Sequence, residues 1–321
     1  SSSDGGGHGG NGGDYESGST GDTYGDVEQP TTIGASGAHQ DGYTGCRGGS
    51  GGGAVKLSAL SGTITVAGTI SADGNNSDSW GGGGAGGSVW IEAGTVDVTE
   101  TGTVTSSGGN GNSTGGGGGG GRIAIHYTDT GTNAVSSWDL QAYGGPGSGS
   151  STEGRDGGAG TIFLDDGTGQ GDLVVGNGSN DNSNRTTQVT TASQTFDNIT
   201  VKDGADYYVG SGYTLVVASG GSLTGSGTYQ PTLTIDAGTL DTGVTSFSFS
   251  GVDIDYDSDS TLATVQDLTI GSDAAFRSYD TGTLSLSGTV TVQSGGTLTH
   301  ADNSTAQTNV LTVSADAIDI Q

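Results

Sequence analysis

The sequence predicts an all-β protein, a β-solenoid of stacked coils with little or no α-helix. Three observations lead to this fold class. A strand-like motif recurs at a fixed interval in the first half, short apolar segments alternate with polar residues, and 69 of the 321 residues are glycine. Glycine, serine, threonine and aspartate disfavour helix interiors, and no apolar period of 3.6 residues is present. Short strands joined by tight turns are therefore the expected elements.

The repeat in the first half is the strongest of these signals. The motif at 53–57 (GAVKL) returns at 87–91 (GSVWI) and 121–125 (GRIAI) at intervals of 34 residues, and at 160–164 (GTIFL) after a further 39. Each unit continues with two more short strands. The expected strands are Val55–Leu57, Thr63–Val66 and Thr69–Ser71 in the first unit, then Val89–Glu92, Thr95–Val98 and Thr103–Thr105 in the second.

Such units are expected to stack, because one unit has too few apolar residues to bury a core alone. Stacking in register forms one interior ladder from Val55, Val89, Ile123 and Ile162, and a second from Leu57, Ile91, Ile125 and Leu164. Trp90 then falls on the opposite face, where replacement should matter less. Residues 32–53, with Ile33 in a third strand, are interpreted as the tail of a preceding unit, so that the chain begins partway through an array.

Glycine-rich blocks separate these units, at 81–84 and 115–121 for example. Glycine runs are commonly flexible linkers. Their recurrence at a fixed phase favours the other interpretation, ordered polyglycine stacked from coil to coil, where the absence of Cβ allows close backbone packing. Glycine also tolerates the positive φ of tight corners.

The second half has short strands and tight turns instead. Strands are expected at 198–201, 207–209, 214–217, 232–235, 247–249, 252–256, 267–270, 283–286, 289–292 and 310–313, with a last strand at Ala317–Ile320. The motif at 217–224 (VASGGSLT) returns at 292–299 (VQSGGTLT). Three segments follow: Gly-rich repeats over 1–165, a polar loop or boundary over 166–195, and a second solenoid over 196–321.

Composition excludes several classes of function. Seven basic residues against 35 acidic ones give a net charge of −28, so the chain is not suited to bind nucleic acid. No apolar run approaches the length of a membrane span. A single cysteine, Cys46, cannot form an internal disulfide. Acidity and the lack of a targeting signal favour an extracellular or cell-surface location. Because Met is absent even at position 1, we expect a processed product or a fragment.

The turn and strand at 294–299 (SGGTLT) resemble the right-handed parallel β-helix passengers of bacterial autotransporters and adhesins. The Gly-rich unit at 86–125 is similar to repeats of large secreted bacterial surface proteins. The resemblance covers most of the chain. It implies a right-handed parallel β-helix and a surface location, and it transfers no active site.

Two groups of acidic residues are candidate metal ligands. Asp253, Asp255, Asp257 and Asp259 alternate with apolar residues, which places them on one face of a strand. Carboxylates in register repel one another, so Ca²⁺, which prefers oxygen ligands, is the candidate cofactor. The alternative is a solvated acidic face that binds no metal. Asp165, Asp166 and Asp172, around a Gly-rich turn, form the second group.

The sequence therefore predicts a non-enzymatic extracellular structural protein, a subunit of a filament, sheath or adhesive matrix. Its expected partners are further copies of itself, stacked end to end or side by side, and surface glycans. One alternative is a carbohydrate-active β-helix such as a tailspike-like glycosidase, which an aligned cleft of carboxylates and aromatic residues would favour. An ice-binding solenoid with Thr-x-Thr rows is the other.

Overall fold

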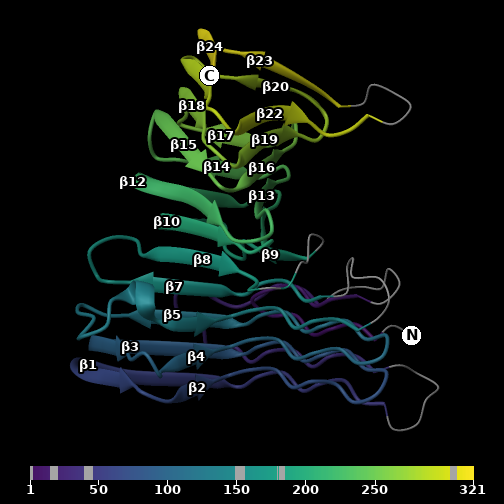
Figure 1. Cartoon of the computed structure of the whole chain (residues 1–321), viewed down its shortest axis with the longest axis vertical. Coiled ribbons are helices and arrows are strands. Elements are labelled where there is room, and N and C mark those ends of the chain that lie inside the picture. Colours follow the sequence, from purple (N-terminus) through teal and green to yellow (C-terminus); the bar gives the residue numbers. More distant parts are fainter. Residues whose placement is uncertain are drawn as a thin grey trace.

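The computed structural model describes residues 3–14, 21–39, 46–148, 156–178, 180, 185–303 and 309–321. Within them the chain is all-β apart from one 3₁₀ turn, η1 (Val135–Ser137), and its strands form tall stacks (Figure 1). Every described strand pairing is parallel except the one between β7 and β8. An all-β fold of mostly parallel strands is confirmed, and it is compatible with a β-helix.

The first half stacks as the repeat predicts. One row contains β1 (Ala54–Val66), β3 (Ser88–Val98), β5 (Arg122–His126) and β7 (Thr161–Asp165), and a second contains β2 (Thr69–Ser71), β4 (Thr103–Thr105) and β6 (Asp139–Gln141). Val55 pairs with Val89, Val89 with Ile123, and Ile123 with Ile162. The parallel ladder beginning at Leu57 has the same register. Both predicted ladders are confirmed.

The glycine tracts are ordered segments packed against one another, drawn without arrows beside the first-half strands in Figure 1. Along 82–87, successive backbone N–H groups donate to the carbonyl oxygens of three neighbouring segments in turn. The amides of Gly82 and Ala85 donate to the segment 35–38. Those of Gly83 and Gly86 donate to the segment 116–119, and those of Gly84 and Gly87 to the segment 72–75. Bonding to the same neighbour at every third residue fits the three-residue turn of polyproline II. A Cβ on Gly84 would lie 2.1 Å from the carbonyl oxygen of Ser50. The tracts need glycine for close approach, as the ordered interpretation predicted.

The two halves meet at an antiparallel pair, β7 with β8 (Asp172–Gly176). Ile162 lies opposite Val174 and Phe163 opposite Leu173, and opposed residues of a strand pair share one face. The face with Ile162 and Val174 packs on the first-half core, whereas the face with Phe163 and Leu173 belongs to the second-half core. The buried side of the sheet therefore changes at this junction.

The second half returns to each sheet at intervals of 20 to 29 residues. The sheet that contains β8 continues through β10 (Ser193–Lys202), β12 (Thr214–Ser226), β15 (Ser246–Ser250), β18 (Asp267–Ile270), β21 (Thr289–Val292) and β24 (Ala317–Ile320). A second sheet contains β9 (Thr186–Gln188), β11 (Asp206–Val209), β13 (Thr232–Ile235), β16 (Asp253–Tyr256), β19 (Ala274–Ser278) and β22 (Gly296–His300). A third face contains β14 (Thr239–Asp241) and β17 (Thr261–Ala263), which continue from β12, and the pair β20 (Thr281–Ser285) and β23 (Val310–Ser314).

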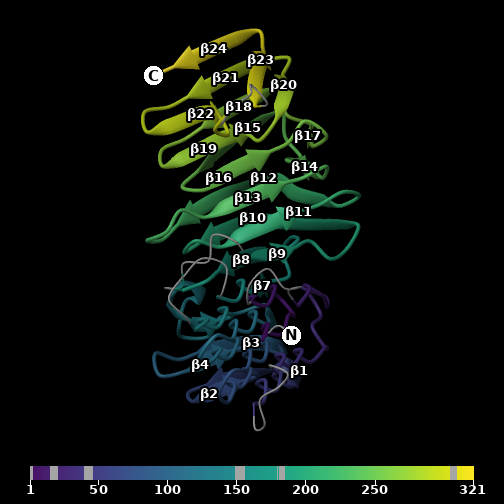
Figure 2. The same cartoon turned by 90° about the vertical axis from the view of Figure 1, so that its right-hand side faces the viewer.

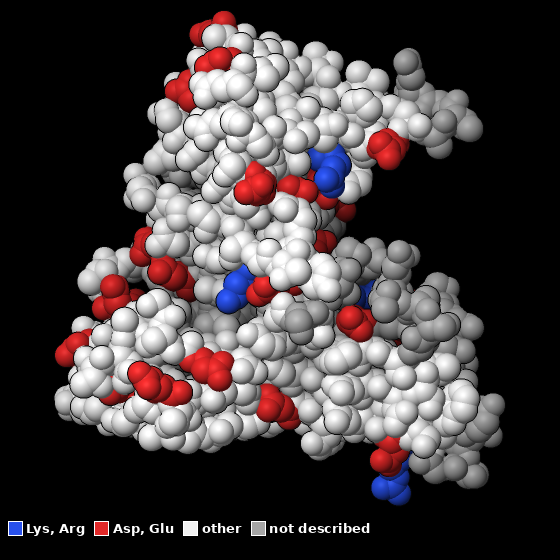
Figure 3. Space-filling view, in the orientation of Figure 1, with Lys and Arg blue, Asp and Glu red and all other residues white. Residues whose placement is uncertain are grey.

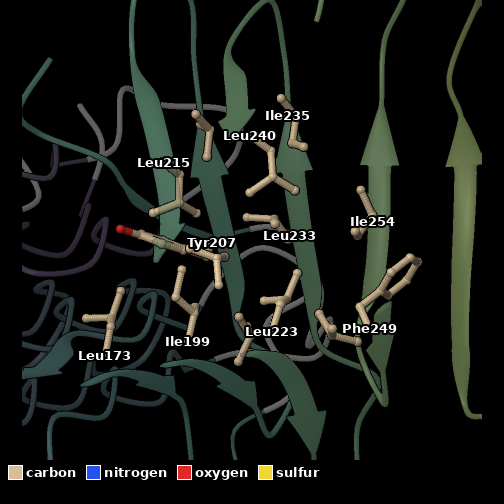
Figure 4. Packing of buried hydrophobic residues seen from close by; sticks show 14 of the residues in the cluster. Leu173, Ile199, Tyr207, Leu215, Leu223, Leu233, Ile235, Leu240, Phe249 and Ile254 are labelled. Carbon is tan, nitrogen blue, oxygen red and sulfur yellow. The ribbon is translucent and has the colours of Figure 1, made fainter. Parts of the chain in front are cut away.

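Aliphatic and aromatic side chains from these strands fill the second-half core. Leu215 and Leu223 of β12, Leu233 of β13 and Ile254 of β16 are fully buried and belong to one cluster of this core (Figure 4). Alternation of buried and half-exposed residues, as in Thr232–Ile235, confirms the period of two expected for these strands. The repeated SGGxLT motif serves two different corners, because 217–224 lies within β12 whereas 292–299 joins β21 to β22.

The described residues of 32–53, which are 32–39 and 46–53, form no strand below β1, so the prediction of a preceding coil is wrong for them; residues 40–45 lie outside the described part. The segment 21–33, called the crossing segment here, runs over the outward face of the first-half sheet. Hydrogen bonds hold it there from Arg122 Nε to the Tyr24 oxygen and from Ser88 Oγ to the Thr32 oxygen. Ile33 is 65% exposed and lies in no strand. Figure 2 shows the N-terminal chain beside the first-half coils.

Trp90 lies on the face opposite Val89 and Ile91, as predicted, but that face is buried. Trp90 is 8% exposed and clusters with Ala124 and Phe163, and Lys56 Nζ lies 3.1 Å from the centre of its ring. The expectation that replacing Trp90 would matter little is therefore corrected. The segment 166–195, expected as a polar loop, contains β8, β9 and the start of β10; residues 179 and 181–184 lie outside the described part.

Candidate functional site

A groove of about 540 Å³ lies on the outward face of β11, β13, β16 and β19. The space-filling view is hollowed on the side where these strands lie, and acidic and basic side chains border the hollow (Figure 3). Its lining is mainly polar and aromatic: Gly204, Asp206, Gln230, Thr232, Thr234, Ile235, Asp236, Asp255, Tyr256, Asp257, Arg277 and Tyr279.

Strand alternation places the lining residues in rows. Tyr208 pairs with Thr234, Thr234 with Asp255, and Asp255 with Arg277, which forms one row across four strands. The residues between them along each strand, such as Leu233 and Ile254, point into the core and are fully buried. The groove is thus carried by a rigid sheet whose other face is the hydrophobic core.

Arg277 is the central cation of the groove. Its two terminal nitrogens lie 3.0 Å from Asp255 Oδ1 and 3.2 Å from Asp253 Oδ2. The second oxygen of Asp253 accepts hydrogen bonds from the Ala275 amide at 2.8 Å and from Gln230 Nε2 at 3.0 Å. Asp253 and Asp255 are therefore held by one guanidinium group.

Two carboxyl groups of the groove have raised pKa values. Loss of hydration raises the pKa of Asp206 to about 7, although the Thr234 hydroxyl, 2.8 Å away, stabilises its charged form. Burial also raises the pKa of Asp255 to about 6, against the opposing effect of Arg277. The charge of Asp255 contributes to the shift at Asp206, so the two carboxyl groups are electrostatic neighbours.

Tyrosine side chains border the carboxylates. The Tyr208 hydroxyl lies 2.6 Å from Asp236 Oδ2, and desolvation together with that contact raises its pKa to about 12. Tyr256 donates from its hydroxyl to the Ser260 carbonyl at 2.6 Å. Tyr279 is 50% exposed, so its ring is accessible from solvent.

The structure separates the four predicted ligands Asp253, Asp255, Asp257 and Asp259. Arg277 binds the first two. Asp257 Oδ1 accepts hydrogen bonds from the Ser260 hydroxyl and the amides of Ala237 and Asp259, and these contacts lower its pKa despite partial burial. Asp259 is exposed. Among the described residues, no three His, Cys, Asp or Glu side chains converge as a metal site would require. Calcium binding here stays a prediction.

The second predicted group lies around the β7–β8 turn. Asp165 Oδ2 contacts His126 Nδ1 at 3.1 Å, Asp166 accepts from the Thr168 amide and hydroxyl, and Asp172 Oδ1 accepts from the Asn198 side chain at 2.7 Å. All three charges help to raise the pKa of Tyr127, so they share one neighbourhood. Each carboxylate nevertheless has its own local partner.

Sequence reasoning missed Asp206, Arg277 and the tyrosines as parts of one site. Their strands are up to 71 residues apart in the chain, counted from 206 to 277. To predict that they lie together, one would need the number of residues between successive strands of the same sheet, and that number varies in the second half. The alternation of the DYYV and DIDY segments was the available signal that both strands place polar residues outward.

Threonine pairs with threonine between some neighbouring strands, as Thr63 with Thr95 and Thr269 with Thr291, but these rows are interrupted. Thr65 pairs with Asp97, and Thr291 pairs with Asp319. Carboxylates therefore interrupt the rows that an ice-binding surface would need. No helix in the described part of the chain is long and apolar enough to cross a membrane.

Comparison with known proteins gives no relative for this chain: no family model, no curated protein and no solved structure matches it. Any functional assignment must therefore come from the geometry of the molecule itself.

Proposed function

We propose that this chain is a non-enzymatic extracellular structural protein, a right-handed parallel β-helix whose second half binds surface glycans. The groove on β11, β13, β16 and β19 supports this proposal. It combines outward carboxylates, hydroxyls, one arginine and an accessible tyrosine ring on a rigid sheet. Such a protein would act as an adhesive element of a surface matrix.

The groove's chemistry favours neutral or amine-bearing sugars. Sugar hydroxyl groups donate to carboxylates such as Asp236 and accept from the guanidinium of Arg277, whereas the ring of Tyr279 offers an apolar face for stacking. Polyanionic glycans are disfavoured by the net charge of −28 and because the guanidinium of Arg277 already contacts two aspartates.

Binding can be measured by isothermal titration calorimetry with three probes: a cello-oligosaccharide, a chitosan oligosaccharide and polygalacturonate. We expect binding to at least one of the first two and none to the third. Tyr279→Ala should weaken binding by about tenfold, which corresponds to about 1.4 kcal/mol. Tyr213→Ala is the matched control, because Tyr213 is 36% exposed and lies outside the groove. Equal losses in both variants, or binding of polygalacturonate alone, would contradict the proposal.

A second candidate function, glycoside hydrolysis, is favoured by the paired carboxyl groups. A carboxyl group with a pKa near 7, as at Asp206, can protonate the leaving glycosidic oxygen, and a second, ionised carboxylate such as Asp255 can activate water or stabilise the sugar cation. The two functions differ in one measurement. Release of reducing ends that stops in Asp206→Asn while binding persists would assign an enzyme; binding with no release would assign the adhesive protein.

A further inference from the structure

The β1 end of the stack leaves its core open. Val55, Leu57 and Ile64 of the first coil are partly exposed, whereas their register partners Val89, Ile91 and Val96 in the second coil are fully buried. This coil lies at the lower end of the molecule in Figure 1. Val66, at the end of the same strand, is buried, so the opening lies over Val55, Leu57 and Ile64.

The same end presents an unpaired strand edge. Among the described strands, β1 pairs with β3 and with no other, so the backbone groups on its far side lack a ladder partner. Leu60, in the middle of β1, is 75% exposed. An edge of 13 residues with an exposed leucine is a surface that favours pairing with another strand.

The inward residues of β1 are arranged symmetrically. An irregularity between Ala59 and Thr63 changes which residues point inward, from 55 and 57 before it to 64 and 66 after it. Suppose that two copies of β1 pair in antiparallel orientation, with the centre of the pairing between residues 60 and 61 of each copy. Inward residues of one copy then lie opposite inward residues of the other. In a strand that alternated without interruption, inward residues would lie opposite outward residues about this centre.

We propose that a second copy of this chain pairs its β1 with β1 about a twofold axis that passes between Leu60 and Ser61. Val55 then lies opposite Val66 of the second copy and Leu57 opposite Ile64, so the two open cores become one. The two Leu60 side chains lie beside the axis. This interface is closed and isologous, and it does not rest on the glycan groove.

Charge favours this end of the molecule for self-association. Residues 46–80 contain two basic side chains, Arg47 and Lys56, and two acidic ones, Asp73 and Asp78, in a chain whose net charge is −28. The last coils, residues 281–321, contain three aspartates and no lysine or arginine. Like charge therefore opposes contact at the β24 end and not at the β1 end.

The molecule already contains an edge of this kind that accepts an antiparallel strand. β7, the last first-half coil, pairs with β8 in antiparallel orientation over Thr161–Leu164. The first-half coil geometry is thus compatible with an antiparallel neighbour.

Analytical ultracentrifugation tests the interface with two matched variants, since Leu60 and Ile320 are each 75% exposed at opposite ends of the stack. We expect the wild-type chain and Ile320→Asp to sediment as dimers and Leu60→Asp to sediment as a folded monomer. A wild-type monomer would overturn the proposal. Loss of association in both variants would also overturn it, because that result would indicate an open filament in which β24 of one copy stacks on β1 of the next.

Cysteine pairing tests the register. In a Cys46→Ser background, Ser58→Cys protein mixed with Thr63→Cys protein should form a disulfide-linked dimer, because position 58 faces position 63 across the axis. Each variant alone should not, since its two thiols do not face each other. Cross-linking of either variant alone, or none in the mixture, would overturn the proposed register.

Discussion

The two halves of this protein bury the same sheet in different ways. In the first half, β3 and β5 are covered on both faces. Ile123 and Ala124, neighbours on β5, are each fully buried, one by the interior ladder and the other on the face that the crossing segment covers. In the second half burial alternates, as with Leu268 inside and Thr269 half-exposed on β18. The alternation of apolar and polar residues in the sequence therefore predicts which side chains are buried in the second half. In the first half it predicts fewer buried side chains than the structure has.

Glycine also serves different purposes in the two halves. Tract glycines such as Gly118 have no room for a side chain, because a Cβ would lie 2.0 Å from the Gly84 oxygen. Second-half corner glycines such as Gly220 have open space around them but a φ of +88°. Close packing needs glycine in the first case, and backbone conformation needs it in the second.

The largest effect is expected from charges placed on β5 and β18. Ile123→Asp and Ala124→Asp should each destabilise the protein by more than about 4 kcal/mol, because both bury an unpaired carboxylate. Leu268→Asp should do the same, but Thr269→Asp should cost less than about 1 kcal/mol. Denaturant unfolding followed by circular dichroism measures all four. A mild effect of Ala124→Asp would show that the outer face of the first half is accessible to water.

The next largest effect separates the two uses of glycine. Gly118→Ala should cost about 3 kcal/mol, since the clash is with backbone that cannot move freely. Gly220→Ala should cost about 1 kcal/mol through φ alone. Gly53→Ala is the control: its site is open and its φ is not positive, so the change should be neutral or slightly stabilising. Thermal unfolding of the three variants ranks them. Equal costs for Gly118→Ala and Gly53→Ala would argue against a packed glycine bundle.

The sequence was sufficient to predict the first-half register because a fixed interval of 34 residues and matched apolar positions specify it. It also predicted most second-half strands from alternation. The antiparallel junction at β7–β8 was not predictable, since neither strand contains a signal for chain reversal relative to the stack. The path of residues 21–33 could not be predicted either. This segment is held by contacts such as the one between His126 and the Glu28 carbonyl oxygen, and these polar groups occur in any loop. Arg277 follows Asp255 by 22 residues with no motif that links the two, and only the strand register that pairs them brings them into one site.

The halves should also respond oppositely to pH. Burial lowers the pKa of His8 to about 4, with Arg122 adding to the shift, while its ring contacts the Gly86 oxygen and the Thr32 hydroxyl. The unfolded chain binds that proton more readily, so stability falls as pH drops from about 6.5 toward 4, by about 2 kcal/mol at pH 5. Asp206 has the opposite effect. Because its pKa is raised in the folded state, its contribution to the free energy of unfolding is greatest below about pH 4 and falls as the pH rises toward 7.

Unfolding free energies of wild type, His8→Gln and Asp206→Asn between pH 4 and 8 test this contrast. His8→Gln should remove the loss on the acid side, and Asp206→Asn the loss on the neutral side. Identical pH profiles for all three proteins would show that neither group titrates differently on folding.

The smallest effect is expected from calcium, and it returns to the acidic face of the second half. If Ca²⁺ bridges Asp253, Asp255 and Asp257, chelation should lower the Tm, and Mg²⁺ should restore it poorly because of its stricter octahedral geometry. Arg277 already contacts the first two carboxylates, and the Ser260 hydroxyl and backbone amides bind the third.

We therefore expect EDTA to leave the Tm unchanged, and CaCl₂ to act no better than NaCl at matched ionic strength, because both only screen charge. In Arg277→Gln the two aspartates lose their cation, so Ca²⁺ should raise the Tm of that variant above the value in NaCl. A calcium-specific rise in the wild type would instead show that the ion displaces Arg277 and that the acidic face of β16 is a metal site.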